Sequence, residues 1–392
     1  GGPLKKNSIW FFGSYRHSAV ETAISRTSKS VADIKKFYPK TELFAQQIKG
    51  YQPYVKVTGR LGSGHELSAF FQRDRTHGQS NWYYYFDPIN VYSNGGNVYS
   101  AKLTSAWSQK LTTTFSAGYN NKSGNDNDTY KAFGFDAKGP NIAIYDTTTI
   151  ASGFIAGSGS QILEGGNNMT RTFVPASLYL VRGDLTYFKD GWIGSHEFGT
   201  GMFLEPQNIY DQRTDYTNDG FFREFRVVVD PADPSKGTQA YRRDYATPTS
   251  LQTRQARDSN YAFYLQDNWK PNARLTANIG MRFDYVKRVD EVRGITRQKS
   301  WTVQPRAGAT YLLTDDAKNV LRVSYARLGE QVMGRDGVTI FGADDIASFR
   351  QEYDNNLDGV FETVRLLPAS TATVAAQQIG KGLHQPYIDE FI

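Results

Sequence analysis

The sequence predicts an all-β fold, and more specifically an antiparallel transmembrane β-barrel. Three observations carry this prediction. The chain is rich in aromatic residues but polar on average, its segments alternate between apolar and polar residues, and its connections alternate between short and long. We take these observations in turn.

Aromatic residues make up 14 % of the 392 residues, yet the mean hydropathy is −0.54. No run approaches the roughly 18 consecutive apolar residues that a membrane-spanning helix needs. A barrel strand needs apolar residues only at alternate positions, because one face meets lipid and the other meets the lumen. A barrel therefore reconciles many aromatic residues with a polar average.

The alternation is clear in residues 51–61, where Tyr51 and Val55 point one way and Lys56 and Arg60 point the other. A short turn containing glycine and serine follows, and then a second alternating segment. This pattern is typical of a β-hairpin with one apolar face. Similar segments occur at 9–15, 65–74, 99–107, 111–119, 179–187, 196–204, 261–266, 275–284, 304–311 and 321–325, with 221–228 as a further candidate. We expect about 12 strands, each near the roughly 10 residues that a tilted membrane strand requires.

The connections between these segments alternate in length. Five turns of a few residues separate the hairpin strands, whereas the other connections are long and rich in Gly, Asn, Asp and Thr. Outer-membrane barrels have short periplasmic turns and long extracellular loops. The predicted long loops are residues 17–49, 75–96, 120–176, 205–257, 286–302 and 328–388.

The tryptophans support the same orientation. Trp107, Trp192 and Trp269 lie at or beside short turns, and Trp301 lies where a strand begins after a long connection. Barrels concentrate aromatic residues in girdles at the two membrane boundaries. Ordinary packing is the alternative role for each tryptophan.

The composition also narrows the function classes. There are no cysteines, and the five histidines have no zinc-ligand spacing. No nucleophile elbow or phosphate-binding loop occurs, so we expect no enzyme. The net charge of +6 is spread along the chain, which favours general solvation over nucleic-acid binding.

Residues 354–362 form the sharpest local motif, with oxygen-bearing residues at alternate positions and a glycine at the sixth. Calcium loops of the EF-hand type have this spacing, although the twelfth position here is Arg365 instead of a bidentate glutamate. A polar turn in an extracellular loop is the alternative. The predicted ligands are Asp354, Asn356, Asp358, the Val360 carbonyl and Glu362. Calcium is the one metal that we expect, and no cofactor is required.

Several segments, read together, resemble the barrel of TonB-dependent receptors of the Oar-like, carboxypeptidase-regulatory-like-domain-containing family. The similarity is carried by residues 1–15, 261–284, 305–308, 321–327 and 384–391, which occur in the order and spacing of successive barrel strands.

This resemblance implies a 22-stranded barrel with an N-terminal plug. It also implies a TonB box that couples the plug to the TonB–ExbB–ExbD system, outer-membrane lipid around the wall, and an extracellular ligand of unidentified class. The expected location is the outer membrane of a Gram-negative-type bacterium. We therefore expect residues 1–392 to be a partial barrel domain in which the plug, the TonB box and the C-terminal strands are absent.

In such a barrel, charged residues on the lumen face line water or contact the plug. Plug contact is the preferred role here, and selectivity for a substrate is the alternative. The predicted lumen-facing residues are Lys56, Arg60, Lys102, Arg182, Asp184, Arg282, Asp284, Arg306 and Arg322.

Two other functions remain open from the sequence. The first is a passive porin-like or structural and adhesive outer-membrane barrel, which would have no plug or TonB box. The second is a secreted β-rich binding module with no membrane role, which would stay soluble without detergent.

Overall fold

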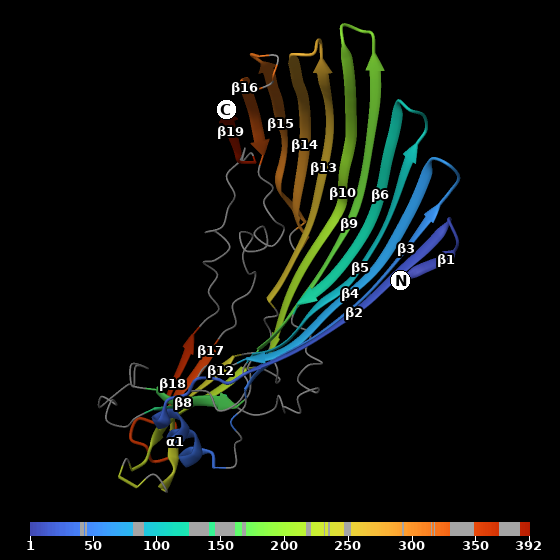
Figure 1. The fold of residues 1–392 in the computed structure, drawn as a ribbon. Helices are drawn as coiled ribbons and strands as arrows, with labels where there is room; N and C mark the ends of the chain where they lie inside the picture. The colour runs from blue at the N-terminus through green and yellow to red at the C-terminus, as the bar shows by residue number, and fades with distance from the viewer. Residues whose placement is uncertain are drawn as a thin grey trace.

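The structure is a computed structural model of the chain. It describes residues 1–39, 43, 45–80, 90–124, 141–145, 161–166, 170–216, 221–230, 232–233, 236–246, 252–291, 294–314, 316, 318–329, 349–367 and 385–392. These residues form one large curved sheet, a smaller second sheet and one helix (Figure 1).

The large sheet, which we call the wall, has 13 strands, and every neighbouring pair is antiparallel. Its strands follow chain order, because each hairpin lies beside the previous one. In order they are β1 (Gly2–Lys5), β2 (Ile9–Thr22), β3 (Gln46–Arg60), β4 (His65–Ser80), β5 (Asn90–Ala106), β6 (Leu111–Gly124), β9 (Thr170–Asp190), β10 (Ser195–Tyr216), β13 (Gln252–Lys270), β14 (Leu275–Asp290), β15 (Ile295–Leu312), β16 (Val320–Gly329) and β19 (Tyr387–Phe391).

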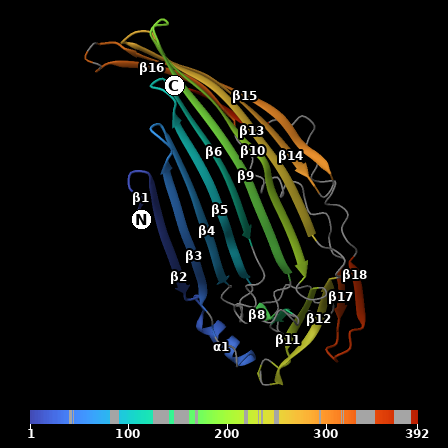
Figure 2. The same cartoon turned by 90° about the vertical axis from the view of Figure 1, so that its right-hand side faces the viewer.

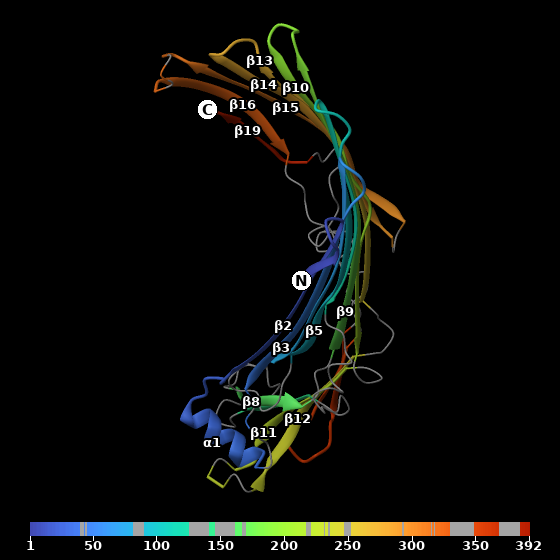
Figure 3. The ribbon, with the colours of Figure 1, turned by 45° about the vertical axis from the view of Figure 1, so that its right-hand side comes forward.

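The wall confirms the predicted fold class. Figure 3 shows it curved like part of a cylinder, with β1 and β19 at its two edges. The short turns gather at one end, which we call the turn end (top in Figure 1), and the second sheet and the helix lie at the other, the loop end. The described residues of the predicted short turns at 62–64, 108–110, 189–193, 270–273 and 314–318 all lie at the turn end.

The outward face of the wall is apolar, and the described residues leave its large side chains exposed. Leu265, Ile279 and Val323 are 58 %, 57 % and 58 % exposed, although each is a large hydrophobic side chain in the middle of a strand. Exposed apolar residues in such number are typical of a surface that meets lipid. Among the described residues, no helix is both long enough and apolar enough to cross a membrane.

An aromatic row crosses this outward face from strand to strand. The row consists of Phe71, Tyr99, Tyr119 and Tyr179 on β4 to β9, and Tyr261, Tyr285 and Trp301 on β13 to β15. Neighbouring ring centroids are 4.6 to 6.4 Å apart. Trp301, predicted at the start of a strand, is therefore part of the aromatic row, which is interrupted at β10.

The aromatic row marks one boundary of the apolar band on the outward face, and tryptophans at the turn end mark the other boundary. Trp107 lies eight positions after Tyr99, and Trp269 lies eight positions after Tyr261. Eight residues of strand span about 27 Å, or about 20 Å along the membrane normal at a tilt of 35–45°. This height approaches the apolar band of an outer-membrane barrel, which is about 25 Å tall.

The strands are much longer than this band, and here the sequence prediction was wrong. The ten wall strands from β2 to β15 contain 14 to 22 residues. Much of the predicted loops at 75–96, 205–257 and 286–302 is in fact strand, and in the third of them β14 runs to Asp290 and β15 begins at Ile295. Beyond the aromatic row polar residues are found on both faces, so the sequence lacks the alternation that marks a half-apolar strand.

The second sheet lies at the loop end and is built from the long connections (Figure 2). Its strands come from three separate loops, so residues far apart in the sequence lie side by side. In spatial order they are β18 (Thr363–Leu367), β17 (Phe349–Tyr353), β12 (Thr238–Ala246), β11 (Phe221–Val228), β7 (Asn141–Tyr145) and β8 (Gln161–Gly166). Residues 221–228, a candidate wall strand from the sequence, are thus β11 of this loop-end sheet.

A helix that the sequence did not reveal, α1 (Ser28–Phe37), covers one face of the loop-end sheet. Thr27 caps its first turn, because its hydroxyl accepts a 3.0 Å hydrogen bond from the Ser30 N–H. Ile34 is fully buried against Ile144, Leu163 and Val228. The loop end therefore has a small hydrophobic core of its own.

The band predicts how the wall responds to a charge. Leu265 lies midway between Tyr261 and Trp269, at the centre of the band. In the intact protein, Leu265→Arg should destabilise the state folded in a bilayer by about 2–4 kcal/mol, because it places a charge in hydrocarbon. The matched change on the inward face of the same strand, Asn268→Arg, should cost less than about 1 kcal/mol. Urea titration of folding into lipid vesicles would measure both, and equal costs would contradict the lipid-facing assignment.

Candidate functional site

The inward face of the wall carries the charged residues singled out in the sequence. All nine occupy even positions in regular strands, on the face opposite the aromatic row, which follows from the alternation of side chains. Register aligns Lys102 with Arg182 through Ser116 on β6, and Arg282 with Tyr264 and Gln304. Lys56 and Arg60 lie on β3, Asp184 on β9, Asp284 on β14, Arg306 on β15 and Arg322 on β16.

Two of these arginines are paired with the two aspartates. The Arg182 Nε donates to Asp184 Oδ2 at 2.8 Å, and the Arg282 Nε donates to Asp284 Oδ1 at 2.8 Å. Each pair lies two positions apart along one strand. The acids therefore hold the guanidinium groups against the wall.

The other cations have no such partner. Within the described part of the chain, no carboxylate lies within 4.0 Å of Lys56, Lys102, Arg306 or Arg322. Arg60 stacks on the Trp10 ring, with 5.2 Å between the guanidinium carbon and the ring centroid. The cations of the inward face therefore form a surface that would favour an anionic group in the lumen. We call it the basic strip, and it consists of Lys56, Arg60, Lys102, Arg182, Arg282, Arg306 and Arg322.

A shallow concavity of about 560 Å³ opens on this strip. Gly280, Gly308 and Ala326 are among the small residues that line it, and Arg182, Arg282 and Arg306 contribute their side chains. Gln266, Asn268, Asn278 and Ser324 add amide and hydroxyl groups. The lining can therefore donate many hydrogen bonds to a polar or anionic partner.

Tyr264 links three strands beneath this concavity. Its hydroxyl on β13 donates a 2.7 Å hydrogen bond to Asp184 Oδ1 on β9, crossing β10 between them. The crossing is feasible because β10 has glycine at position 201. A Cβ at Gly201 would lie 2.5 Å from the Tyr264 ring and 2.9 Å from Asp184 Oδ1.

Beyond the aromatic row, the inward face of β13–β15 becomes a buried polar network. Asp258 and Arg288 are 2 % and 3 % exposed, and Arg288 Nη1 donates to Asn260 at 2.8 Å. Burial raises the pKa of Asp258 to about 6, and the nearby Arg288 only partly offsets this shift. Desolvation of the carboxylate therefore outweighs its ion pair.

At the loop end, arginines stack on the aromatic residues of the second sheet. Arg223 and Arg242 lie over the Phe225 ring at 5.0 and 4.6 Å, and Arg242 also lies over Tyr353 at 5.7 Å. Glu164, which is 5 % exposed, accepts hydrogen bonds from Asn141 at 3.2 Å and from Gln161 at 2.7 Å. These contacts join strands from different loops into one unit.

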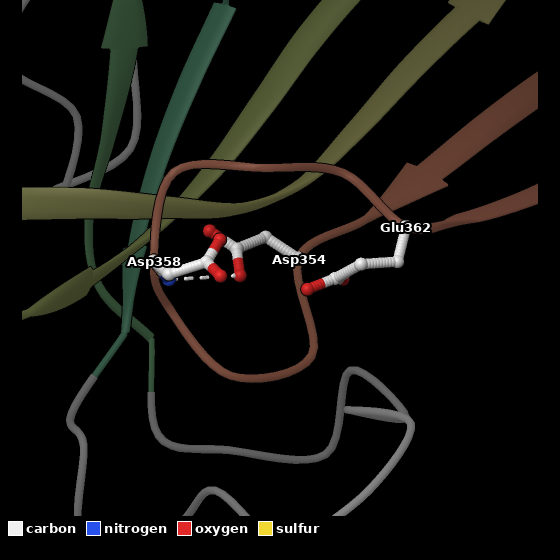
Figure 4. A group of neighbouring side chains, drawn as sticks. All are labelled: Asp354, Asp358 and Glu362. Carbon is white, nitrogen blue, oxygen red and sulfur yellow. Dashed lines mark hydrogen bonds between the residues drawn. The ribbon is translucent and has the colours of Figure 1, made fainter.

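The predicted calcium loop connects β17 and β18, and the structure brings its acids together (Figure 4). One carboxylate oxygen from each of Asp354, Asp358 and Glu362 lies within 4.8 Å of the other two. Asp354 is 1 % exposed, whereas Asp358 and Glu362 are exposed. Gly359 adopts φ +92°, the left-handed conformation that the sixth position of such a loop demands.

The backbone of this loop is held in place from inside. Asp354 accepts hydrogen bonds from the N–H groups of Asp358 at 3.2 Å and Gly359 at 2.8 Å. Asn356 bonds to Asp358 through both its side-chain oxygen and its nitrogen. The Val360 N–H donates to Asp358 Oδ1 at 2.8 Å, so its carbonyl is the group left to ligate an ion.

Sequence reasoning missed several residues of the inward face. Tyr264, Gln304 and Gly201 take part in its hydrogen bonds or make them feasible. A tyrosine between Ala262 and Gln266, on the polar side of the alternation, was the available signal for Tyr264. Gly199 and Gly201 lie two positions apart in a strand and therefore on the same face. Their missing side chains were the available signal that a side chain from a neighbouring strand could cross β10.

Comparison with known proteins adds to this geometry. The family model described as "TonB dependent receptor-like, beta-barrel" matches residues 49–366. The chain belongs to this family. The receptor family was thus predicted correctly from the sequence, and its members are outer-membrane receptors and transporters instead of enzymes. No curated protein matches the sequence.

Solved TonB-dependent receptors have the same fold. The chain superposes on the outer membrane transporter YddB from Escherichia coli with a TM-score of 0.53 and 11 % identity, covering 89 % of this chain and 42 % of YddB. P. aeruginosa FpvA, in a complex with a pyoverdine and iron, gives a TM-score of 0.52 and 11 % identity over 90 % of this chain and 44 % of FpvA. The chain therefore spans less than half the length of these receptors.

The Tyr264 bridge can be tested by substitution in the intact receptor. Tyr264→Phe removes a hydrogen bond to a charged acceptor and should cost about 1.5–3 kcal/mol of unfolding free energy. Gly201→Ala should cost at least as much, because its Cβ would meet both the Tyr264 ring at 2.5 Å and the Gly183 carbonyl oxygen at 2.6 Å. Since both changes disrupt the Tyr264–Asp184 bond, the double variant should cost less than the sum of the two single variants. Additive losses in denaturant unfolding would show that Gly201 acts independently of Tyr264.

Proposed function

We propose that this chain forms part of the wall and the external cap of an outer-membrane receptor in a Gram-negative-type bacterium. The receptor would take up or translocate a ligand in a process energised through TonB. The observation that carries the proposal is the wall itself, with a lipid-facing apolar side and a basic, hydrogen-bonding inward side. Membership of the TonB-dependent receptor family supports it.

The proposal assigns a side of the membrane to each end of the wall. Short turns are periplasmic in outer-membrane barrels, so the turn end faces the periplasm and the loop end faces outward. The loop-end sheet and α1 would then stand above the membrane and form the surface that meets an extracellular ligand. Four connections of the barrel contribute to this surface, which makes its shape depend on all of them.

The basic strip is proposed to hold the receptor's own plug domain. The carboxylates of the plug would bind the cations that have no carboxylate partner among the described residues, which are Lys56, Lys102, Arg306 and Arg322. Asp184 and Asp284 would keep Arg182 and Arg282 from competing for these carboxylates. The plug in turn would be the part that contacts TonB of the TonB–ExbB–ExbD system. Selectivity for an anionic ligand that passes the strip is the alternative role of the same charges.

Membership in the Oar-like group is also part of the proposal. It is supported by the order of the segments at 1–15, 261–284, 305–308, 321–327 and 384–391, of which all but residue 384 lie in described strands or turns. These segments fall in β1, β2, β13–β16 and β19.

A passive porin is the competing function, and electrical conductance separates the two. In planar bilayers, the intact receptor should be closed because the plug fills its lumen. Removing the unpaired charges with Lys102→Gln and Arg306→Gln should loosen the plug and increase the frequency of channel opening at least severalfold. A steadily open channel in the unmodified receptor would favour the porin.

We further propose that the β17–β18 loop binds calcium through Asp354, Asn356, Asp358, the Val360 carbonyl and Glu362. These residues provide hard oxygen ligands, which calcium prefers in sets of six to eight, and water would complete the set. Leu357, within the loop, packs against the buried cluster of Tyr145, Phe225 and Tyr241. A bound ion would therefore fasten the β17–β18 hairpin to the loop-end sheet.

Calcium binding can be measured by isothermal titration of the intact receptor with calcium chloride. At 100 times the dissociation constant, calcium should stabilise the loop-end sheet by about 2.7 kcal/mol against unfolding. Asp358→Asn and Glu362→Gln should each weaken binding at least about tenfold, because each removes a charged ligand.

Asp230→Asn is the matched control for the calcium variants. Asp230 also accepts backbone hydrogen bonds in a loop-end turn, from Ala232 at 2.9 Å and Asp233 at 3.3 Å, but among the described residues it is not grouped with other acids. Binding should be unchanged in this variant. If the unmodified receptor takes up no calcium at millimolar concentration, the loop is only a polar turn.

A further inference from the structure

The outward face of β2–β4 carries a group of basic side chains that neither the barrel wall nor the basic strip explains. Register aligns His17 with Tyr51 and Arg75, and aligns Lys49 with His77. Arg73 lies two positions from Phe71 of the aromatic row, and hence on the same face. We call Lys49, Arg73 and Arg75 the outward basic patch.

The patch lies at the membrane boundary. Arg73 is eight positions from the turn-end start of β4, and Lys49 is 11 positions from the turn-end limit of β3. Residues of the aromatic row lie at similar distances, such as Tyr119, eight positions into β6, and Trp301, 11 positions from the end of β15. The patch is therefore at the height of the girdle, where lipid headgroups meet the protein.

Two of its charges, Lys49 and Arg73, are not neutralised by a described residue on their own face. Across the described residues, no carboxylate lies within 4.0 Å of Lys49 or Arg73, and both side chains are exposed. Asp74, next to Arg73 in sequence, points to the inward face and bonds to Gln52 at 3.1 Å. Glu21, further along the outward face, bonds to Gln47.

A concavity of about 320 Å³ adjoins the two arginines of the patch. Gly95 and Gly96 line it without side chains. A larger residue would not fit there, because a Cβ on either glycine would lie 1.7 Å from a backbone oxygen of the neighbouring strand. Asn97, Asn121, Ser123 and Ser177 line it with amide and hydroxyl groups, and Tyr119 borders it toward the apolar band. Guanidinium groups beside small polar residues form a surface that suits a phosphate group.

We propose that the outward basic patch binds the phosphate of an anionic lipid headgroup in the outer leaflet. This proposal rests on the proposed function, which places the wall in a membrane with its loop end outside. The concavity opens on the lipid-facing side, so a headgroup enters it with its acyl chains lying along the apolar residues below. Val55, Val57 and Leu67 are 48 %, 40 % and 40 % exposed there and would contact those chains.

A second observation on the far side of the wall points the same way. Lys287 and Lys299 are directly opposed on β14 and β15, on the outward face, and each lies two positions beyond the aromatic row. Like charges in directly opposed positions destabilise a strand pair. A lipid phosphate between the two ammonium groups would remove that repulsion, so the same class of ligand explains both places.

The test uses the intact receptor purified in an uncharged detergent. Native mass spectrometry would measure binding of a diphosphorylated lipid A, of the same glycolipid without phosphate, and of inorganic phosphate. We expect the phosphorylated lipid to bind most tightly. Lys49→Gln with Arg73→Gln should weaken it about 10- to 30-fold, given about 1 kcal/mol for each cation near a lipid surface.

The matched control is Lys35→Gln with Lys36→Gln on α1. It removes two charges from a surface away from the outward face, and should leave lipid binding unchanged. Circular dichroism of both double variants, compared with the unmodified receptor, would verify that each keeps its strand content.

Three results would overturn the proposal. They are equal binding by the patch variant and the unmodified receptor, equal binding of lipid with and without phosphate, and binding of inorganic phosphate alone. Each of these leaves the conductance of the receptor unaffected, so the proposed transport function could stand. If the receptor instead fails to enter bilayers at all, the proposed function fails first and lipid binding is lost in every variant.

Discussion

The structure depends on one constraint, which is that a strand in lipid must find partners for its backbone N–H and C=O groups on both sides. Each unpaired group in hydrocarbon costs several kcal/mol. Between its edge strands β1 and β19, the wall meets this constraint with an antiparallel ladder in which chain order and spatial order agree. The register of the ladder fixes which side chains face lipid and which face the lumen, because a shift of one residue would exchange the two faces. The aromatic row, the basic strip and the outward basic patch are all consequences of that alternation.

The same ladder explains why the inward face can hold a connected set of polar groups. Side chains on neighbouring strands lie about 5 Å apart, and only glycine lets a longer side chain cross a whole strand. Gly201 allows Tyr264 to reach Asp184, and the small residues around Gly280 leave room beside Arg282 and Arg306. The inward face is thus shaped as much by missing side chains as by charges. Its acids restrain two arginines, and the remaining cations stay available to a partner in the lumen.

Beyond the band, the strands continue into water and the constraint relaxes. Polar residues then occupy both faces, and strands that leave the wall can pair with segments from other loops. The loop-end sheet arises in this way, with β7 parallel to β11 and β17 beside β12. Its core is small, with Ile34 of α1 packed on three other buried residues, so arginine–aromatic contacts and buried acids share in holding it together. The calcium-like loop lies at the edge of this unit, where an ion would affect the packing of Leu357.

The sequence alone determined the all-β class, the apolar and charged faces of the wall, the turn end and the receptor family. The class and the two faces could be predicted because a strand with lipid on one side only must alternate between apolar and polar residues. The sequence also predicted nine lumen-facing charges, which the structure places on the inward face, and five calcium ligands, which stay a prediction. Only the tertiary structure decided how far the strands extend, since residues such as Arg75, Asp211 and Lys287 lie beyond the apolar band, where the alternation disappears. Tertiary structure also decided that β11 leaves the wall, that Thr27 caps a helix in a predicted loop, and that Tyr264 and Gln304 join the inward network. Those outcomes depend on pairing between strands distant in sequence, and no local pattern of residues encodes such pairing.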